Sequence, residues 1–307
     1  MVKDKKAIKA AICACLFLVA VYFLAVWTPF GQGLENDLLK RADINVWIEH
    51  PQYRPSSPPP ILSSGQAVVA GIVLILVALI RRRMRLVLWA VVALAGSGAT
   101  ALLLKVMLPR PVLDPTYHPL HNSAPSGHVA MATAVAITAM VVSPSVFKYV
   151  AAAAGVVVAT LTAYFVQSSS WHRPSDVLMG VAVSLSWALL ASAVIPVAGD
   201  EPRRSRGTTG LLLAGLIVPA AIAMWWASGK HVNPGFLVIV SSAAPCAAVA
   251  IFALHHPRLP SGSASDVNGH TAEGGSSPAT RLTDLVGTGV LSCLVLAAPF
   301  ALTGQFA

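Results

Sequence analysis

Charged side chains are scarce in this sequence. Asp, Glu, Lys and Arg make up only 11% of its 307 residues, whereas about 25% is usual in a soluble domain. Hydrophobic residues make up 56% of the chain, and its mean hydropathy is +0.71. A chain with so few charges is not water-soluble throughout.

Cysteine is also rare, and its placement excludes a disulfide framework and a zinc site. Cys13 and Cys15 point to different faces of a helix, and no cysteine has metal-ligand spacing with a histidine. We expect all the cysteines to be small core residues. All of them lie in apolar segments: Cys13, Cys15, Cys246 and Cys293.

Long apolar segments, by contrast, are abundant. A helix that crosses a bilayer needs about 20 predominantly apolar residues. The first segment is too long for a removable signal peptide and lacks a small-residue cleavage pattern. The sequence therefore predicts an all-α, polytopic membrane protein with nine spans, at residues 10–29, 63–80, 86–104, 127–143, 147–167, 177–197, 210–227, 235–254 and 284–303.

The formal net charge of +9 follows this predicted topology rather than a nucleic-acid-binding surface. With the amino terminus in the cytoplasm, nine spans leave 14 of the 21 Lys and Arg residues inside. Seven lie outside, and Lys105, Arg110 and Arg173 are among them. We therefore expect a multi-pass protein of the plasma membrane, with the bilayer and no nucleic acid as its surroundings.

The chain divides into two predicted regions. Residues 1–198 hold six spans and all the motifs that carry chemistry, which lie within residues 105–176. Residues 199–307 form a C-terminal appendage with three further spans. Within it, residues 255–283 are rich in Ser, Gly, His and Ala without a hydrophobic period, which predicts a disordered cytoplasmic loop.

The first outer loop, residues 31–62, contains a candidate helix. Apolar residues recur in it at helical spacing among charged ones, with a tryptophan at the end. This pattern is typical of a short amphipathic helix on the membrane surface or of an ordinary solvated loop helix. The residues concerned are Leu34, Leu38, Ala42, Val46 and Trp47.

The string Pro125-Ser126-Gly127-His128 begins the fourth predicted span. A helix start offers free backbone N–H groups and the positive end of a dipole, which together bind phosphate. Ser126 adds a hydroxyl donor, and His128 is positioned to protonate an oxygen that leaves phosphorus. An ordinary turn capped by a histidine is the alternative interpretation.

A second cluster begins 44 positions after His128. His172 and Asp176 are four residues apart, so they share one face if the sixth span starts near Arg173. Pro174 suits the first turn of a helix there. A carboxylate on one imidazole nitrogen fixes the tautomer and leaves the other nitrogen free to attack phosphorus. The alternative is a structural His–Asp hydrogen bond that closes the end of the span.

Cations after the third span complete the candidate site. Lys105 and Arg110 would stabilise the charge that spreads over a phosphoryl group in transfer, without a metal. Cations that reach from a helix end to water are the common alternative. The predicted topology brings both cations and both motifs to one outer face.

These motifs resemble those of the type 2 phosphatidic acid phosphatase (PAP2) superfamily of membrane lipid phosphatases, in a form similar to an actinobacterial subset. The resemblance covers roughly residues 60–198 and implies a six-helix core with its site at the outer membrane face. It implies that His172 is a nucleophile that forms a phosphohistidine, that Asp176 orients it and that His128 is the general acid. The phosphate-binding residues that it implies are Lys105, Arg110, Ser126 and Gly127.

The sequence departs from the family pattern at two points. The family usually has six residues between the Lys and the Arg of its first motif, but only four separate Lys105 from Arg110. The Arg expected six residues before the nucleophile is replaced by Val166, and losing one cation costs about 3 kcal/mol of transition-state stabilisation. Arg173 compensates, or the serines at 168–170 bind phosphate, or the rate is low.

The sequence as a whole predicts a phosphatase without metal or cofactor that acts at the outer membrane face. Its substrate would be a lipid phosphate or diphosphate, such as a polyprenyl diphosphate, phosphatidic acid or a phosphorylated glycolipid. Two alternatives stay open: a transferase that passes the phosphoryl group to another lipid or sugar, and a catalytically weak phospholipid-binding or scaffold protein. Acid–base roles for two histidines predict a bell-shaped pH profile. The oligomeric state is not indicated.

Overall fold

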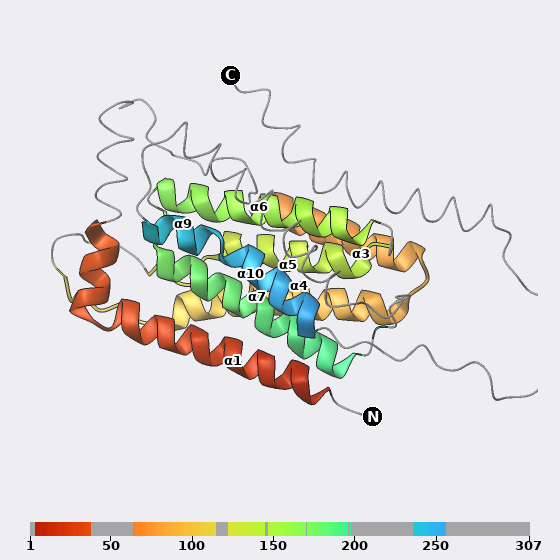
Figure 1. Cartoon of the computed structure of the whole chain (residues 1–307), viewed down its shortest axis with the longest axis horizontal. Coiled ribbons are helices and arrows are strands. Elements are labelled where there is room, and N and C mark those ends of the chain that lie inside the picture. The colour runs from red at the N-terminus through yellow and green to blue at the C-terminus, as the bar shows by residue number, and fades with distance from the viewer. Residues whose placement is uncertain are drawn as a thin grey trace, which may run out of the picture.

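The computed structural model describes residues 4–37, 64–114, 122–144, 147–169, 171–195, 197 and 236–255. Every regular element in these residues is helical, and Figure 1 shows the longer helices running side by side in a bundle. The expected all-α class is confirmed for this part of the chain. The labelled elements are α1 (Lys5–Val21), the π-helical turn η1 (Tyr22–Val26), α3 (Ser64–Ile80), α4 (Met84–Met107), α5 (Gly127–Val142), α6 (Lys148–Ser168), α7 (Pro174–Val194), α9 (Phe236–Ser242) and α10 (Ala244–His255). Residues 29–37 are also helical and have no label of their own.

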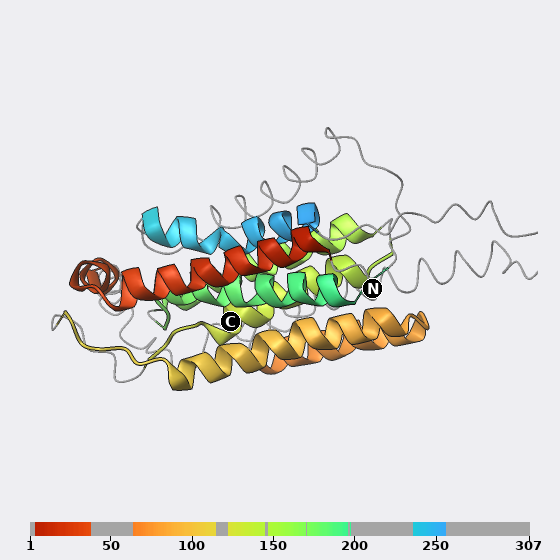
Figure 2. The ribbon, with the colours of Figure 1, turned by 90° about the horizontal axis from the view of Figure 1, so that it is seen from below.

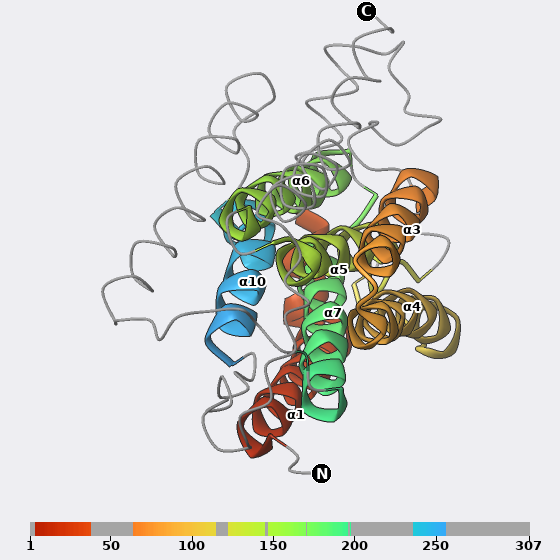
Figure 3. The ribbon, with the colours of Figure 1, turned by 90° about the vertical axis from the view of Figure 1, so that its right-hand side faces the viewer.

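Helix α5 lies at the centre of the bundle. Helices α3, α4, α6, α7 and α10 all pack against it, and the end-on view in Figure 3 shows it surrounded by them. Helix α1 lies outside this ring, against α7. Figure 2 shows α3 and α4 as a pair on one side of the bundle and α10 on the opposite side. Most side chains of α5 are consequently buried.

Small residues allow these helices to approach one another closely. A Cβ on Gly155 of α6 would lie 2.7 Å from the Cα of Ala136 in α5. A Cβ on Gly180 of α7 would lie 2.6 Å from the carbonyl oxygen of Ser126, so neither glycine has room for a side chain. Close contacts between small residues are a common way to pack helices in membranes. The second contact fixes the start of α5 against α7.

Several described helices suit a membrane. Helices α3, α5 and α10 are apolar but shorter than a full span. Large apolar side chains on the outside of the bundle stay exposed, including Leu102 and Val106 of α4. The chain is therefore a membrane protein, as its composition predicts. Within the described residues, the segments that are long and apolar enough to cross a bilayer are Lys5–Val26, Met84–Met107, Lys148–Ser168 and Pro174–Val194.

The first six predicted spans correspond to α1 with η1 and to α3 through α7. The predicted spans at 210–227 and 284–303 lie outside the described residues, as does nearly all of the predicted loop at 255–283. The number of membrane spans therefore stays a prediction.

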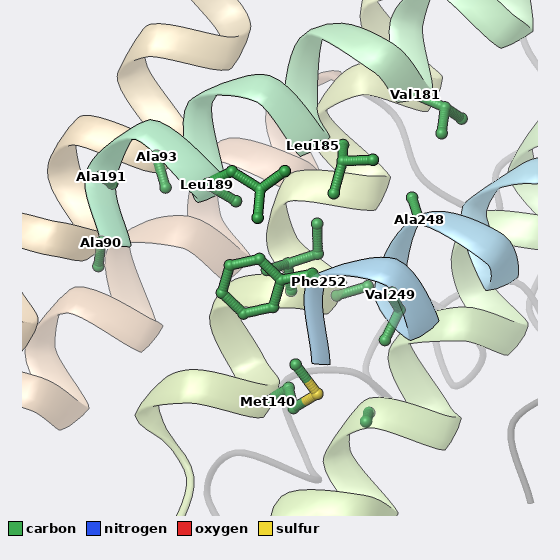
Figure 4. Packing of buried hydrophobic residues seen from close by; sticks show 14 of the residues in the cluster. Ala90, Ala93, Met140, Val181, Leu185, Leu189, Ala191, Ala248, Val249 and Phe252 are labelled. Carbon is green, nitrogen blue, oxygen red and sulfur yellow. The ribbon is translucent and has the colours of Figure 1, made fainter. Parts of the chain in front are cut away.

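The eighth predicted span, residues 235–254, corresponds to two helices, α9 and α10, which are separated at Ala243. Helix α10 packs against α5, α6 and α7. Its Phe252 is fully buried, 5.8 Å from the ring of Trp89, and Figure 4 shows it between Leu189 of α7 and Met140 of α5. This segment thus belongs to the same apolar core as the spans before it.

Candidate active site

Polar side chains from several segments gather at one end of the bundle. The segments are the end of α4 with the loop after it, the start of α5, the connection from α6 into α7, and a helix of residues 29–37. In Figure 1 this end lies at the left, where the short red helix stands. The segments contain every residue predicted for the site: Lys105, Arg110, Ser126, Gly127, His128, His172, Arg173 and Asp176.

The start of α5 is held against the first turn of α7. The N-cap residue Ser126 donates its backbone N–H to the carbonyl oxygen of Asp176 (2.8 Å). Its hydroxyl accepts a hydrogen bond from the N–H of Val129 (3.4 Å), and the residue is fully buried. A Cβ on Gly127, in contrast, would meet no atom within 4 Å. The first turn of α5 therefore borders an open space, and its free N–H groups suit an anion there.

The carbonyl oxygen of Val166 holds the second motif. It accepts hydrogen bonds from the N–H groups of Trp171 (3.0 Å) and His172 (2.9 Å), which end α6 and turn the chain toward α7. His172 Nδ1 then lies 3.4 Å from Asp176 Oδ2, and the N–H of Arg173 donates to the same oxygen (3.0 Å). The four-residue spacing thus brings the His and the Asp together, as predicted.

The two motif histidines lie close to each other. The ring centroids of His128 and His172 are 6.2 Å apart, and the ring of Trp171 is 6.1 Å from that of His128. His128 is partly exposed, whereas His172 is only 5% exposed. A phosphoryl group fits between such rings if its phosphorus lies about 3 Å from a nitrogen of one ring and the leaving oxygen about 3 Å from a nitrogen of the other.

Arg110 belongs to a buried charge network. Its Nη2 lies 3.3 Å from Asp176 Oδ1 and 3.8 Å from Glu35 Oε2, and its Nη1 donates to the hydroxyl of Ser123 (3.3 Å). That hydroxyl donates in turn to Asp176 Oδ2. The side chain of Arg110 is only 7% exposed. Carboxylates of the protein itself therefore neutralise this cation.

The other two predicted cations differ from each other. Lys105, in the last turn of α4, is partly exposed and close enough to Asp176 and His128 for its charge to act on both. Arg173 is 4% exposed and donates to the side-chain oxygen of Asn36 (2.8 Å). Lys105 and His128 thus border the open side of the site. Among the described residues, no cluster of His, Cys, Asp and Glu side chains is arranged to hold a metal ion.

The helix of residues 29–37 contributes to the site in a way the sequence analysis missed. A helix was expected in this region, on the membrane surface or in solvent, but Glu35 and Asn36 are only 3% and 1% exposed. Gln32, Glu35 and Asn36 are spaced i, i+3 and i+4, so they share one helix face. That polar spacing was the available signal. Residues 38–47 of the expected helix lie outside the described part of the chain.

Glu35 is bound at the start of α7. It accepts hydrogen bonds from the N–H (2.7 Å) and the hydroxyl (3.0 Å) of Ser175. Burial raises the pKa of Glu35 to about 7, the charge of Asp176 adds to this rise, and Arg110 opposes it. The charge of Glu35 therefore changes near neutral pH.

The position where the family pattern has an Arg does not contribute a side chain to the site. Val166 is 3% exposed and packs in the apolar core. The neighbouring Gln167 accepts a hydrogen bond from Ser241 (2.7 Å) and donates one to Ser242 (3.0 Å), both in α9. The hydroxyl of Ser168 donates to a carbonyl of its own helix (3.2 Å). In this structure, neither Gln167 nor Ser168 replaces the missing cation.

Comparison with known proteins shows that the segment with this geometry matches a protein family. Residues 86–200 match the family model described as the PAP2 superfamily, which confirms the resemblance drawn from the motifs. The matched segment includes every predicted site residue, whereas residues 29–37 and α10 lie outside it. No curated protein and no solved structure matched the chain.

Proposed function

Because residues 86–200 are a PAP2 superfamily domain, and members of this superfamily are generally phosphatases of phosphate esters, we propose that the protein is a lipid phosphatase. Its substrate is a phosphate or diphosphate on a lipid, and the reaction uses neither metal nor cofactor. The observation that carries the proposal is the pair of histidines, His128 and His172, with ring centroids 6.2 Å apart and Asp176 beside His172.

Two steps of proton and phosphoryl transfer follow from this arrangement. Asp176 beside Nδ1 keeps the lone pair of His172 on Nε2, which attacks phosphorus as the bond to the lipid oxygen breaks. His128 gives its proton to the departing oxygen. His128 then takes a proton from water, whose oxygen attacks the phosphohistidine. Inorganic phosphate leaves, and both histidines return to their starting states.

The other phosphate oxygens are held by backbone and cations. The open space beside Gly127 supports binding of the phosphate at the first turn of α5. Lys105 is partly exposed and close enough to His128 and Asp176 for its charge to act on them, so it supplies a positive charge to the phosphate. Arg110 shares its guanidinium between Asp176 and the phosphate. Arg173 is bound to Asn36, so it acts on phosphate only if it leaves that partner.

The lipid tail and the membrane orientation belong to the same proposal. The amino terminus is cytoplasmic, and the polar end of the bundle opens at the outer face of the plasma membrane. The excess of Lys and Arg in the predicted inner loops supports this orientation. Six spans form the phosphatase core, and three more follow. The tail of the substrate stays among apolar side chains or in the bilayer while its head enters the site.

Phosphate release tests the proposal. Wild type and His172→Ala are given a panel of lipid phosphates and diphosphates in EDTA, with Asp37→Asn as control because Asp37 lies on the 29–37 helix but is exposed. We expect release by the wild type and by D37N, and none above background by H172A. Radiolabelled phosphate should appear on the wild-type protein in an acid-labile form and be absent from H172A.

Two other results would replace the proposal. Phosphate that appears on an added lipid or sugar, with little free phosphate, would identify a transferase. A folded wild type that binds phospholipid but releases nothing would indicate a binding or scaffold protein. In that case Val166, in place of the usual Arg, would be the decisive departure from the family pattern.

A further inference from the structure

The segment before the family-matched domain holds the loop that carries Arg110. The hydroxyl of Tyr22 donates to the carbonyl oxygen of Pro109 (2.6 Å). The side-chain amide of Gln32 donates to the carbonyl oxygen of Pro111 (2.7 Å), and its oxygen accepts from the N–H of Leu113 (3.0 Å). The backbone on both sides of Arg110 is therefore bonded to residues outside 86–200.

The same segment also holds the start of α7. Glu35 binds the N–H and the hydroxyl of Ser175, the residue next to Asp176. Asn36 accepts from Arg173 (2.8 Å) and donates to Asp114 (2.9 Å). The 29–37 helix thus connects the loop after α4 to the first turn of α7.

Within the 29–37 helix, Glu35 is the carboxylate that contacts both Arg110 and Ser175. Its Oε2 lies 3.8 Å from Arg110 Nη2, and it is buried together with Ser175. Without it, the buried N–H of Ser175 would lose its acceptor, and among the described residues Arg110 would keep Asp176 as its one carboxylate partner. A long, flexible Arg side chain with one partner fewer has more freedom to leave the site.

We propose that Glu35 is a positioning residue of the phosphate site: it holds Arg110 beside Asp176 and fixes the first turn of α7. The catalytic unit therefore begins in the N-terminal segment, before the family-matched domain. The inference rests on the proposed phosphatase function. Displacement of a reacting group by about 1 Å is enough to lower a rate about 100-fold, so this hold matters for catalysis.

The charge of Glu35 is part of this role. The charged and titratable groups around it are Arg110 from the loop after α4 and Asp176 from α7, while Arg173 and Asp114 are joined to the adjacent Asn36. The ionised carboxylate attracts Arg110, and the protonated one does not. Because the pKa of Glu35 is raised to about 7, its hold on Arg110 weakens as the pH falls below neutral.

The kinetic test uses Glu35→Gln and Glu35→Ala, with D37N as the exposed control on the same helix. kcat and KM are measured from pH 5 to 9 per folded molecule. We expect E35A to lower kcat at least about tenfold. E35Q keeps the shape of the side chain but is neutral at every pH, so it should lower kcat about threefold to tenfold and lose the wild-type change in rate near pH 7. Rates within twofold of wild type, or an unchanged pH profile in E35Q, would overturn the proposal.

A second measurement does not depend on activity. The thermal unfolding midpoints of E35Q, Arg110→Met and the double variant form a mutant cycle. We expect the double variant to lose about 2–4 °C less than the sum of the single losses, because both changes remove one interaction. Additive losses would overturn the hold of Glu35 on Arg110. If the wild type proves inactive, the proposed function fails, while coupling in this cycle still supports that hold.

Discussion

The polar end of the bundle has two parts that differ in exposure. The open part consists of partly exposed residues: Lys105, Gly127 and His128. The buried part consists of charged side chains that are between 0% and 7% exposed: Glu35, Arg110, Arg173 and Asp176. The nucleophile proposed above, His172, adjoins both, because it is beside Asp176 and 6.2 Å from the ring of His128.

This difference in exposure separates residues that act mainly in catalysis from residues that also stabilise the fold. A buried charge that loses its partner costs about 3–5 kcal/mol, so the members of the buried part stabilise the fold as well as the site. A partly exposed side chain has water as an alternative partner. Changes in the open part should therefore lower activity with little effect on stability, whereas changes in the buried part should lower both.

Asp176→Ala should have the largest effect. It leaves Arg110 without its nearest carboxylate and His172 without its orienting partner. We expect activity to fall at least about 1,000-fold and the free energy of unfolding to fall by about 3–5 kcal/mol. Lipid phosphatase assays and thermal unfolding in detergent measure the two losses. Asp176→Asn, which keeps the shape, should lose less stability. A D176A protein as stable as wild type would show that the buried part does not support the fold.

His128→Ala should give the opposite pattern. The loss of a general acid lowers kcat about 100-fold to 10,000-fold, while a partly exposed side chain contributes little to stability. The unfolding midpoint should stay within about 2 °C of wild type. An aryl phosphate with an acidic leaving group needs no proton donor, so the release of its phenol in the first turnover should be affected much less, although the later attack of water still needs His128. An equal loss of this first-turnover rate for lipid and aryl substrates would contradict the acid role.

Replacing a glycine by alanine can be compared at an open position, Gly127, and at a packed position, Gly180. A Cβ on Gly127 meets no protein atom, whereas one on Gly180 meets the carbonyl oxygen of Ser126 at 2.6 Å. Gly127→Ala should leave the unfolding midpoint unchanged or slightly higher and reduce activity about tenfold, because the methyl group takes space beside the phosphate. Gly180→Ala should reduce the free energy of unfolding by up to about 3 kcal/mol. Full activity in G127A would move the phosphate away from this helix start.

The smallest expected effect is a pH dependence of stability. Folding raises the pKa of Glu35 from 4.5 to about 7, mainly through burial. Between these values the folded protein binds the proton and the unfolded chain does not, so the free energy of unfolding falls as the pH rises. The E35Q side chain does not titrate, so this fall in the free energy of unfolding is absent from the variant. The stability of wild type relative to E35Q should therefore drop by about 2 kcal/mol from pH 5 to pH 8. A constant difference in unfolding midpoint would mean that Glu35 does not titrate in this range.

Much of the fold and part of the site could be predicted from local patterns. The boundaries predicted for the fourth span, 127–143, nearly coincide with α5, because Ser126 is a favourable N-cap. The pairing of His172 with Asp176 was predicted from a four-residue spacing. His172 precedes the N-cap residue Arg173, however, so the turn before α7, and not the helix itself, brings the two side chains together. The PAP2 resemblance, drawn from the same residues, is confirmed by the family match.

Other features were beyond such patterns. The helix at 29–37 was interpreted from its apolar spacing as a surface element, yet its polar face is buried against the site. The sequence also offered Arg110 and Arg173 as free cations, but the structure gives both of them protein partners. These partners come from segments that are far apart in the chain.

The sequence by itself determined which chemical groups are available and which segments form the described long helices, because apolar length, caps and turn spacing depend on neighbouring residues. Only the tertiary structure decided which charges are open and which are buried. Glu35 meets Ser175 across 140 positions of sequence, and no local period records such a contact. It arises because α1 and α4 both pack against α7. This packing brings the 29–37 helix, the loop after α4 and the start of α7 to one end of the bundle, where buried charges need partners.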